Sequence, residues 1–228
     1  MSKTAEELLN IMKAQAMGDK CFDHILGFIS PGMTELEVAD EIERYLRSLG
    51  AEGLSFPTIV VSGERGDQIH GEPSEKKIEV GDFVTIDMGA VFNGYCGDMT
   101  RTVAIGDVTD EMYDVYHIVL EAQLAGLEEL RAGASCFDID RKVRGIIEEA
   151  GYGEYYIHGT GHGVGTEVHE PPYLNTRTDE ILEADTAVTV EPGIYIPGKF
   201  GVRIEDLAIV TDFAIINATS SPKELIIL

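Results

Sequence analysis

The chain has 228 residues, 44% of them hydrophobic, and carries a formal net charge of −24. This length suffices for one sizeable domain or two small ones. The charge argues against binding nucleic acid, whose phosphates require lysine and arginine, and it is compatible with attracting metal cations or the ammonium group of a peptide.

The cysteines and the apolar runs bear on the cellular compartment. Cys21, Cys96 and Cys136 form neither a CxxC motif nor an even framework, which is typical of free thiols in a reducing environment. The first residues lack the apolar core of a signal peptide, and no apolar run approaches the ~18 residues of a membrane span. We therefore expect a cytoplasmic protein that has no membrane segment.

The first predicted elements are amphipathic helices at residues 5–30 and 34–49, separated by Pro31-Gly32. A strand at 56–61 and a polar loop at 62–68 follow. An apolar strand pattern at 83–86 then ends on Asp87, and the chain turns through Asn93-Gly94 toward Asp98 and a strand at 102–105.

The second set of predicted elements begins with a helix at 110–131, which joins the two parts of the chain. A helix at 135–150, a glycine-rich loop, strands at 186–191 and 202–210 and a short final strand at 224–228 follow. We predict an α+β fold in which helices back a curved antiparallel sheet.

Segments 32–50 and 133–151 resemble each other, since both open with a capping signal, carry one apolar face at helical spacing and end at glycine. Further on, the strand that ends on Asp87 aligns with the strand that ends on Glu191, and Asp98 aligns with Glu205. We infer a single domain, 1–228, whose halves, about 20–108 and 120–215, face each other across a pseudo-twofold axis.

The four aligned acids indicate a metal site. Two carboxylates held close together are costly unless a cation lies between them. Each acid alone has an ordinary alternative as a strand end, a turn residue or, for Glu205, an ion-pair partner of Arg203. Their matching places in the repeat favour ligation.

A histidine-rich stretch, His158 to His169 with His162 between them, supplies a nitrogen ligand. The alternative is a flexible loop with incidental histidines. Histidine is the commonest metal-binding side chain, and oxygen ligands with one imidazole suit two divalent ions, manganese, cobalt or iron, with zinc also open. The sequence contains no P-loop, GxSxG, HExxH or GxGxxG motif.

Six motifs then show a family resemblance: Asp87-Met-Gly, Gly97-Asp98-Met-Thr-Arg-Thr, Gly161-His162-Gly-Val-Gly, Val168-His169-Glu-Pro, Glu191-Pro-Gly and Gly201-Val-Arg-Ile-Glu205-Asp206. They resemble the pita-bread (M24) metallopeptidases, which include methionine aminopeptidases, Xaa-Pro aminopeptidases and prolidases. The resemblance covers essentially the whole chain. It implies a catalytic domain with the pita-bread fold and a dinuclear metal centre, with Mn²⁺ or Co²⁺ favoured.

The resemblance also implies residue roles. The metal ligands would be Asp87, Asp98, His162, Glu191 and Glu205, with Asp98 and Glu205 bridging both ions. Glu191 would also shuttle protons, while His70 and His169 would contact the substrate and stabilise the transition state. His158 and Arg203 match residues near the site of the Xaa-Pro branch. The implied reaction is attack of a metal-bridging hydroxide on the N-terminal peptide bond of Xaa-Pro peptides or dipeptides.

Two features bear on the branch of the family. Asp-Met-Thr-Arg-Thr and Gly-Val-Arg-Ile-Glu-Asp are similar to the Xaa-Pro enzymes, and Ile69 stands where methionine aminopeptidases usually have cysteine. The chain begins at the catalytic domain, however, a length closer to a bacterial methionine aminopeptidase. Methionine aminopeptidase is therefore the first alternative.

A non-catalytic peptide-binding or protein-binding domain is the second alternative, although such relatives typically lose metal ligands. A creatinase-like amidinohydrolase is a weaker alternative still. We expect a peptide substrate, and a homodimer stays open.

Overall fold

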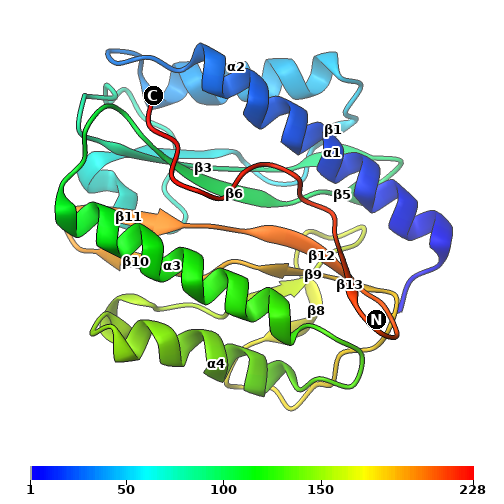
Figure 1. The fold of residues 1–228 in the computed structure, drawn as a ribbon. Coiled ribbons are helices and arrows are strands. Elements are labelled where there is room, and N and C mark those ends of the chain that lie inside the picture. Colours follow the sequence, from blue (N-terminus) through cyan, green and yellow to red (C-terminus); the bar gives the residue numbers. More distant parts are fainter. Residues whose placement is uncertain (1) are drawn as a thin grey trace.

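The structure is a computed structural model that describes residues 2–228. Helix α1 (Ala5–Phe28) packs on α2 (Glu35–Ser48), and α3 (Asp110–Glu129) packs on α4 (Cys136–Glu149). Figure 1 shows α2 at one end of the molecule and α4 at the other, with α1 and α3 in front of the strands. The helices therefore back the strands, as the sequence predicts.

The two repeated segments form α2 and α4, and their starts are capped as predicted. The Thr34 side chain accepts a hydrogen bond from the backbone N–H of Glu37, and the Ser135 side chain accepts one from Asp138. Gly50 and Gly151, just beyond the two helices, adopt positive φ angles of 93° and 89°, which glycine tolerates without strain. Their apolar faces are buried, with Ile42 and Val143 both fully inaccessible.

The strands are short, and neighbouring strands within each sheet are antiparallel. They are β1 (Gly53–Leu54), β2 (Ile59–Ser62), β3 (Phe83–Met88), β4 (Ala90–Phe92), β5 (Tyr95–Cys96), β6 (Met99–Ala104), β7 (Gly161–Gly163), β8 (Glu170–Leu174), β9 (Thr186–Val190), β10 (Gly193–Ile196), β11 (Phe200–Arg203), β12 (Asp206–Val210) and β13 (Ile215–Asn217). The first half holds the sheet β2-β3-β6, and the second holds β13-β12-β9-β7-β8. Two smaller sheets, β1-β4-β5 and β10-β11, complete the set.

Three predicted elements differ from the structure. The strand predicted at 202–210 is two strands, because the ladder breaks at Ile204 and Glu205 between β11 and β12. The polar loop at 62–68 contains a 3₁₀ helix, η1 (Gly63–Asp67), and a second one, η2 (Gly153–Tyr155), follows α4. The final strand predicted at 224–228 is wrong, because only its last residues reach β6, through an isolated bridge between Ala104 and Ile227.

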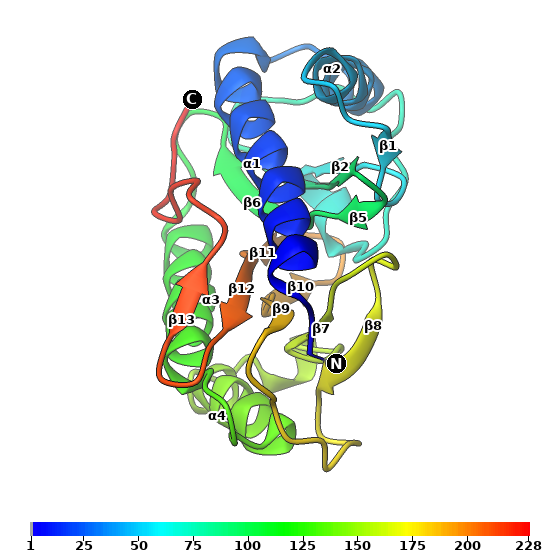
Figure 2. The ribbon, with the colours of Figure 1, turned by 90° about the vertical axis from the view of Figure 1, so that its right-hand side faces the viewer.

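The C-terminal segment runs along the helix side of the sheets, between α1 and α3 (Figures 1 and 2). Its anchor is Arg101 of β6, which is 1% exposed. The Arg101 guanidinium donates to the carbonyls of Ser221 and Pro222 and to the carboxylate of Asp206. It also donates to the carbonyl of Glu205, so one side chain ties the segment to both halves.

We expect Arg101→Met to lower the free energy of unfolding by about 3 kcal/mol, because it removes one of the two cations that pair with the buried Asp206 and the donor to three backbone carbonyls, while Lys223 Nζ stays 2.6 Å from Asp206. Asp206 is fully buried and lies 2.8 Å from the Arg101 guanidinium. Arg131→Met is the control, since Arg131 pairs with Glu129 at the surface and such pairs contribute below ~1 kcal/mol. Urea unfolding measures both variants, and equal losses would contradict the prediction.

The apolar core is divided between the halves. One cluster packs α1 and α2 against β3 and β6 through residues such as Phe22, Ile25 and Ile86. A second packs α3 and α4 against β10 and β11 through Val119, Ile194 and others. Among the described residues, no helix is both long and apolar enough to cross a membrane. The packing leaves the strand ends of both halves facing one another.

Candidate active site

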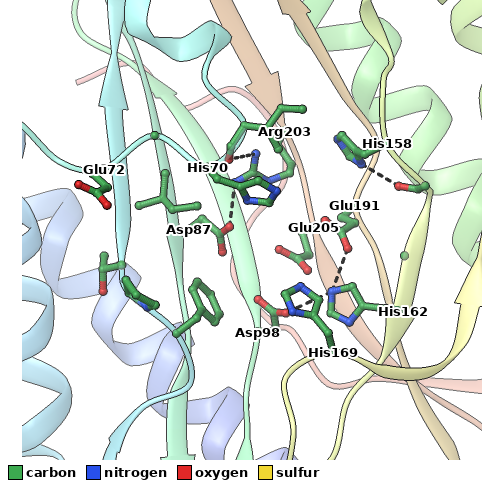
Figure 3. Close-up of a pocket in the computed structure, with 18 of the residues that line it drawn as sticks. His70, Glu72, Asp87, Asp98, His158, His162, His169, Glu191, Arg203 and Glu205 are labelled. Atoms are coloured by element: carbon green, nitrogen blue, oxygen red, sulfur yellow. Dashed lines mark hydrogen bonds and ion pairs between the residues drawn. The ribbon is translucent and has the colours of Figure 1, made fainter.

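A cavity of about 460 Å³ lies between the two halves (Figure 3). Its walls come from the loop after η1, from β3, from the β7–β8 region and from the ends of β9 and β11. The residues singled out in the sequence all line it: His70, Asp87, Asp98, His158, His162, His169, Glu191, Arg203 and Glu205. The repeat therefore brings together side chains that are far apart along the chain.

The first-half acids are positioned by the β3–β6 ladder. Asp87 lies in β3 opposite Thr100 of β6, and Asp98 immediately precedes β6. The β4–β5 hairpin between them turns at Asn93 and Gly94, whose φ angles of 49° and 77° match the turn that this pair favours. The predicted hairpin is therefore confirmed, and it returns the chain so that Asp98 faces the cavity beside Asp87.

The second-half residues lie at interruptions of strands. His162 is in β7, where the register with β8 shifts between His162 and Gly163. Glu191 directly follows β9, and Glu205 lies in the break between β11 and β12. At such places a side chain can leave the alternation of a regular strand and turn toward a site.

Asp98, His162 and Glu205 form a compact group in which one potential ligand atom from each lies within 4.8 Å of the others. His162 Nε2 is 3.0 Å from Glu191 Oε1 and 3.6 Å from Asp98 Oδ2. His162 Nδ1 lies 3.1 Å from the Gly163 carbonyl, so a proton on Nδ1 leaves Nε2 free to bind a metal.

Asp87 stands slightly apart from this group and faces Arg203. The Arg203 guanidinium, 3% exposed, donates to Asp87 Oδ2 at 2.7 Å, to Thr100 Oγ1 at 3.1 Å and to the Tyr195 hydroxyl at 3.0 Å. Tyr195 in turn lies 2.8 Å from His158 Nε2. Arg203 thus connects Asp87 of the first half with Tyr195 and His158 of the second.

The electrostatics of the site reflect three buried carboxylates, those of Asp87, Asp98 and Glu205, and the half-buried Glu191, with too few cations. Burial raises the pKa of Asp98 and of Glu205 well above their usual ranges, and neighbouring carboxylates raise both further. Burial lowers the pKa of His162, but the charge and hydrogen bond of Glu191 and the charge of Glu205 together outweigh it and raise the pKa to about 9. Burial raises the pKa of Glu191, but the charge and hydrogen bond of His162, with the charges of His158 and Arg203, together lower it to about 2.

Two buried carboxylate oxygens, Asp87 Oδ1 and Glu205 Oε1, have no hydrogen-bond partner. A buried acceptor without a partner is rare and costly, and a cation satisfies it. Oxygen ligands with one imidazole are the set that divalent first-row ions accept. The residues present therefore fit a divalent metal site.

Two exposed histidines, His70 and His169, lie on the solvent side of this group. The His169 ring centroid is 4.2 Å from that of His162, and the two ring planes are inclined at 61°. Burial and the charge of His162 lower the pKa of His169, which favours its neutral form. Both rings can reach a peptide that enters the cavity.

Sequence reasoning missed three hydroxyls of the site, two of which orient acids. Thr100 donates to Glu205 Oε2 at 2.6 Å, and Thr189 donates to Glu191 Oε1 at 3.0 Å. Tyr195 bridges Arg203 and His158. Strand alternation could have placed Thr189 on the same face as Glu191, two residues on. No sequence signal identifies Tyr195.

Comparisons with known proteins agree with this geometry. The sequence model of metallopeptidase family M24 matches residues 10–212 of this chain. The chain is 48% identical to the uncharacterized peptidase YqhT of Bacillus subtilis over 99% of its length, and 42% identical to the Xaa-Pro dipeptidase of Pyrococcus furiosus over 98%. Each alignment covers 64% of the relative, so the chain spans just under two thirds of their length.

Solved structures give the same result for the fold. The Xaa-Pro dipeptidase from Bacillus anthracis has a TM-score of 0.98 and 52% identity, covering 100% of this chain and 64% of that one. The X-Pro aminopeptidase from Thermotoga maritima has a TM-score of 0.97 and 41% identity, covering 100% of this chain and 65% of that one. The predicted α+β, pita-bread architecture is therefore confirmed.

Proposed function

The chain belongs to metallopeptidase family M24, and we propose that it hydrolyses the N-terminal peptide bond of Xaa-Pro peptides or dipeptides with the help of two divalent metal ions. The observation that carries the proposal is the buried group of Asp98, His162 and Glu205, together with the carboxylate oxygens Asp87 Oδ1 and Glu205 Oε1, which have no hydrogen-bond partner. Relatives named as Xaa-Pro dipeptidase and X-Pro aminopeptidase support the substrate class.

The proposed ligands are Asp87, Asp98, His162, Glu191 and Glu205. Divalent ions held there would lower the pKa of a water molecule and polarise the scissile carbonyl. We propose Mn²⁺ or Co²⁺, because the set is rich in oxygen and has a single imidazole, with Fe²⁺ and Zn²⁺ as alternatives.

Glu191 is the proposed proton carrier. The Thr189 hydroxyl orients its carboxylate, and the charge and hydrogen bond of His162 keep it charged against the effect of burial. A carboxylate in this place can accept a proton from the attacking water and deliver it to the leaving amine.

The exposed rings of His70 and His169 are proposed to donate hydrogen bonds to the peptide carbonyl as negative charge develops on its oxygen. His158 and Arg203 are proposed to border the substrate. Their hydrogen bonds suit a positioning role, since Arg203 holds Asp87 and Tyr195 holds His158.

The test compares hydrolysis of two sets of peptides, one beginning with Xaa-Pro and the other with Met-Ala. The protein is first stripped of metal and then resupplied with Mn²⁺ or Co²⁺. We expect cleavage of the Xaa-Pro set and none without metal. Release of methionine alone would identify a methionine aminopeptidase. No cleavage of either set by metal-loaded protein would favour a peptide-binding or protein-binding role.

A cytoplasmic location and a single catalytic domain with halves of about 20–108 and 120–215 remain predictions, and assembly into a homodimer stays open. Light scattering of the purified chain would measure its mass in solution. A monomer at micromolar concentration would exclude a stable dimer of this chain.

A further inference from the structure

A fully buried acid, Glu35, lies outside the metal site at the first turn of α2. Such a charge needs several donors to offset its desolvation. Glu35 Oε1 accepts hydrogen bonds from the backbone N–H and the hydroxyl of Ser62, at 2.7 and 2.9 Å. Glu35 Oε2 accepts from the backbone N–H and the hydroxyl of Ser74, at 3.1 and 2.7 Å, and from Arg65 Nε at 3.0 Å.

These donors lie at the two ends of one loop, residues 62–74, which we call the pocket loop. Ser62 ends β2, and Ser74 lies beyond the residues that form the cavity wall. The middle of the pocket loop supplies Ile69, His70, Gly71, Glu72 and Pro73 to that wall. One carboxylate therefore joins both ends of a loop whose middle faces the metal site.

The pocket loop is braced again across its middle. Arg65, held by Glu35, donates from Nη2 to the Glu72 carbonyl at 2.6 Å. The Ile69 carbonyl, next to His70, accepts from Arg203 Nη1 at 3.3 Å. The His70 side chain is exposed, so its position depends on how firmly the backbone on either side is held.

We propose that Glu35 is a positioning residue that fixes the pocket loop and thereby places His70 against the substrate. The part that concerns substrate rests on the proposed peptidase function. Glu35 does not touch the cavity and acts through Ser62, Ser74 and Arg65. A ring displaced by a fraction of an ångström loses much of its effect on the reaction.

The test is a double-mutant cycle between Glu35→Gln and His70→Ala. The amide of glutamine presents a donor where the carboxylate accepts, so one end of the pocket loop loses its anchor. We expect kcat/KM to fall by about 10-fold to 100-fold when His70 is present, and by less than about 3-fold in the His70→Ala background. Metal content should be unchanged. Equal losses in both backgrounds would overturn the assignment.

Glu37→Gln is the matched control. Glu37 lies in the same helical turn and is also an acid, but its side chain accepts hydrogen bonds from Thr34 and not from the pocket loop. We expect its effect on kcat/KM to be the same with and without His70. If Glu37→Gln coupled to His70→Ala as strongly as Glu35→Gln does, the loss of kcat/KM would come from a disturbed start of α2. That result would overturn the proposal.

Hydrogen exchange separates this proposal from the proposed function. In Glu35→Gln, amides of the pocket loop should exchange at least about 10-fold faster, while those of β3 and β6 keep their rates. Unchanged loop exchange would overturn the positioning role even in an active enzyme. If the unmutated protein cleaves no peptide, the peptidase proposal fails, and the exchange result still decides whether Glu35 fixes the loop. Should Glu35→Gln not fold, Ser74→Ala removes one donor and should give the same changes with smaller size.

Discussion

His162→Ala is expected to abolish tight metal binding and peptide hydrolysis together. His162 supplies the imidazole of the compact group, with Nε2 within 3.6 Å of both Glu191 and Asp98. Loss of a residue that merely supports a ligand typically lowers metal affinity 10-fold to 100-fold, so loss of the imidazole itself should cost at least about 100-fold. Metal content after dialysis and kcat/KM on an Xaa-Pro peptide measure the two effects.

His169→Ala is the matched control for that variant. Its ring contacts His162 but lies on the exposed side of the group, where we propose that it donates to the developing oxyanion. This variant should keep its metal and lose about 100-fold in kcat. Full turnover by metal-free His162→Ala would overturn the ligand assignment. Loss of metal from His169→Ala would show that its role is not confined to substrate.

The helical framework could be predicted from the sequence because its signals are local. Thr34 and Ser135 mark helix starts, Gly50 and Gly151 mark helix ends, and the apolar positions follow one face. The similarity between segments 32–50 and 133–151 also allowed a prediction about residues that are distant in sequence. If the two halves face each other, their equivalent strands should bring their acids together. The cavity lined by Asp87, Asp98, Glu191 and Glu205 has this arrangement.

The errors in the strand predictions arose where hydrogen-bond partners are distant in sequence. Residues 202–210 contain apolar residues on both sides of Glu205 and Asp206, but Glu205 leaves the ladder and its backbone N–H donates to the Thr100 carbonyl of the other half. Residues 224–228 are rich in strand-forming side chains, yet β6 offers them only its last positions. Local propensity does not contain that information.

The supporting residues of the site were missed for a related reason. Arg101 belongs to a recognisable motif, but its acceptors at Glu205, Asp206 and Ser221 are visible only in three dimensions. Glu35 reads as an ordinary acid in the first turn of a helix, where negative charge is favourable. Its burial and its link to the pocket loop depend on tertiary packing. The sequence therefore predicted the residues that face the cavity better than those that hold them.

Metal affinity is expected to rise with pH, because the metal-free site holds protons that a metal must displace. The raised pKa of His162, about 9, keeps the imidazole charged at neutral pH, and burial keeps the pKa values of Asp98 and Glu205 above their usual ranges. For each proton released on binding, the affinity should increase about tenfold per pH unit. Calorimetric titration with Mn²⁺ at pH 6, 7 and 8, in buffers of different protonation enthalpy, measures both quantities.

The same shifts fix the sign of the stability change. A histidine whose folded pKa is raised stabilises the metal-free protein fully below its unfolded value of 6.5, and this contribution is lost as the pH rises toward about 9. Carboxyl groups with raised pKa values destabilise it as the pH rises above their unfolded values, since folding opposes their ionisation. Both effects weaken the metal-free protein with rising pH, so saturating Mn²⁺ should raise the melting temperature more at pH 8 than at pH 6. Equal Mn²⁺ affinity at pH 6 and pH 8, without proton release, would show that the metal-free site is already deprotonated. In that case Arg203 and solvent would suffice to offset the repulsion between its carboxylates.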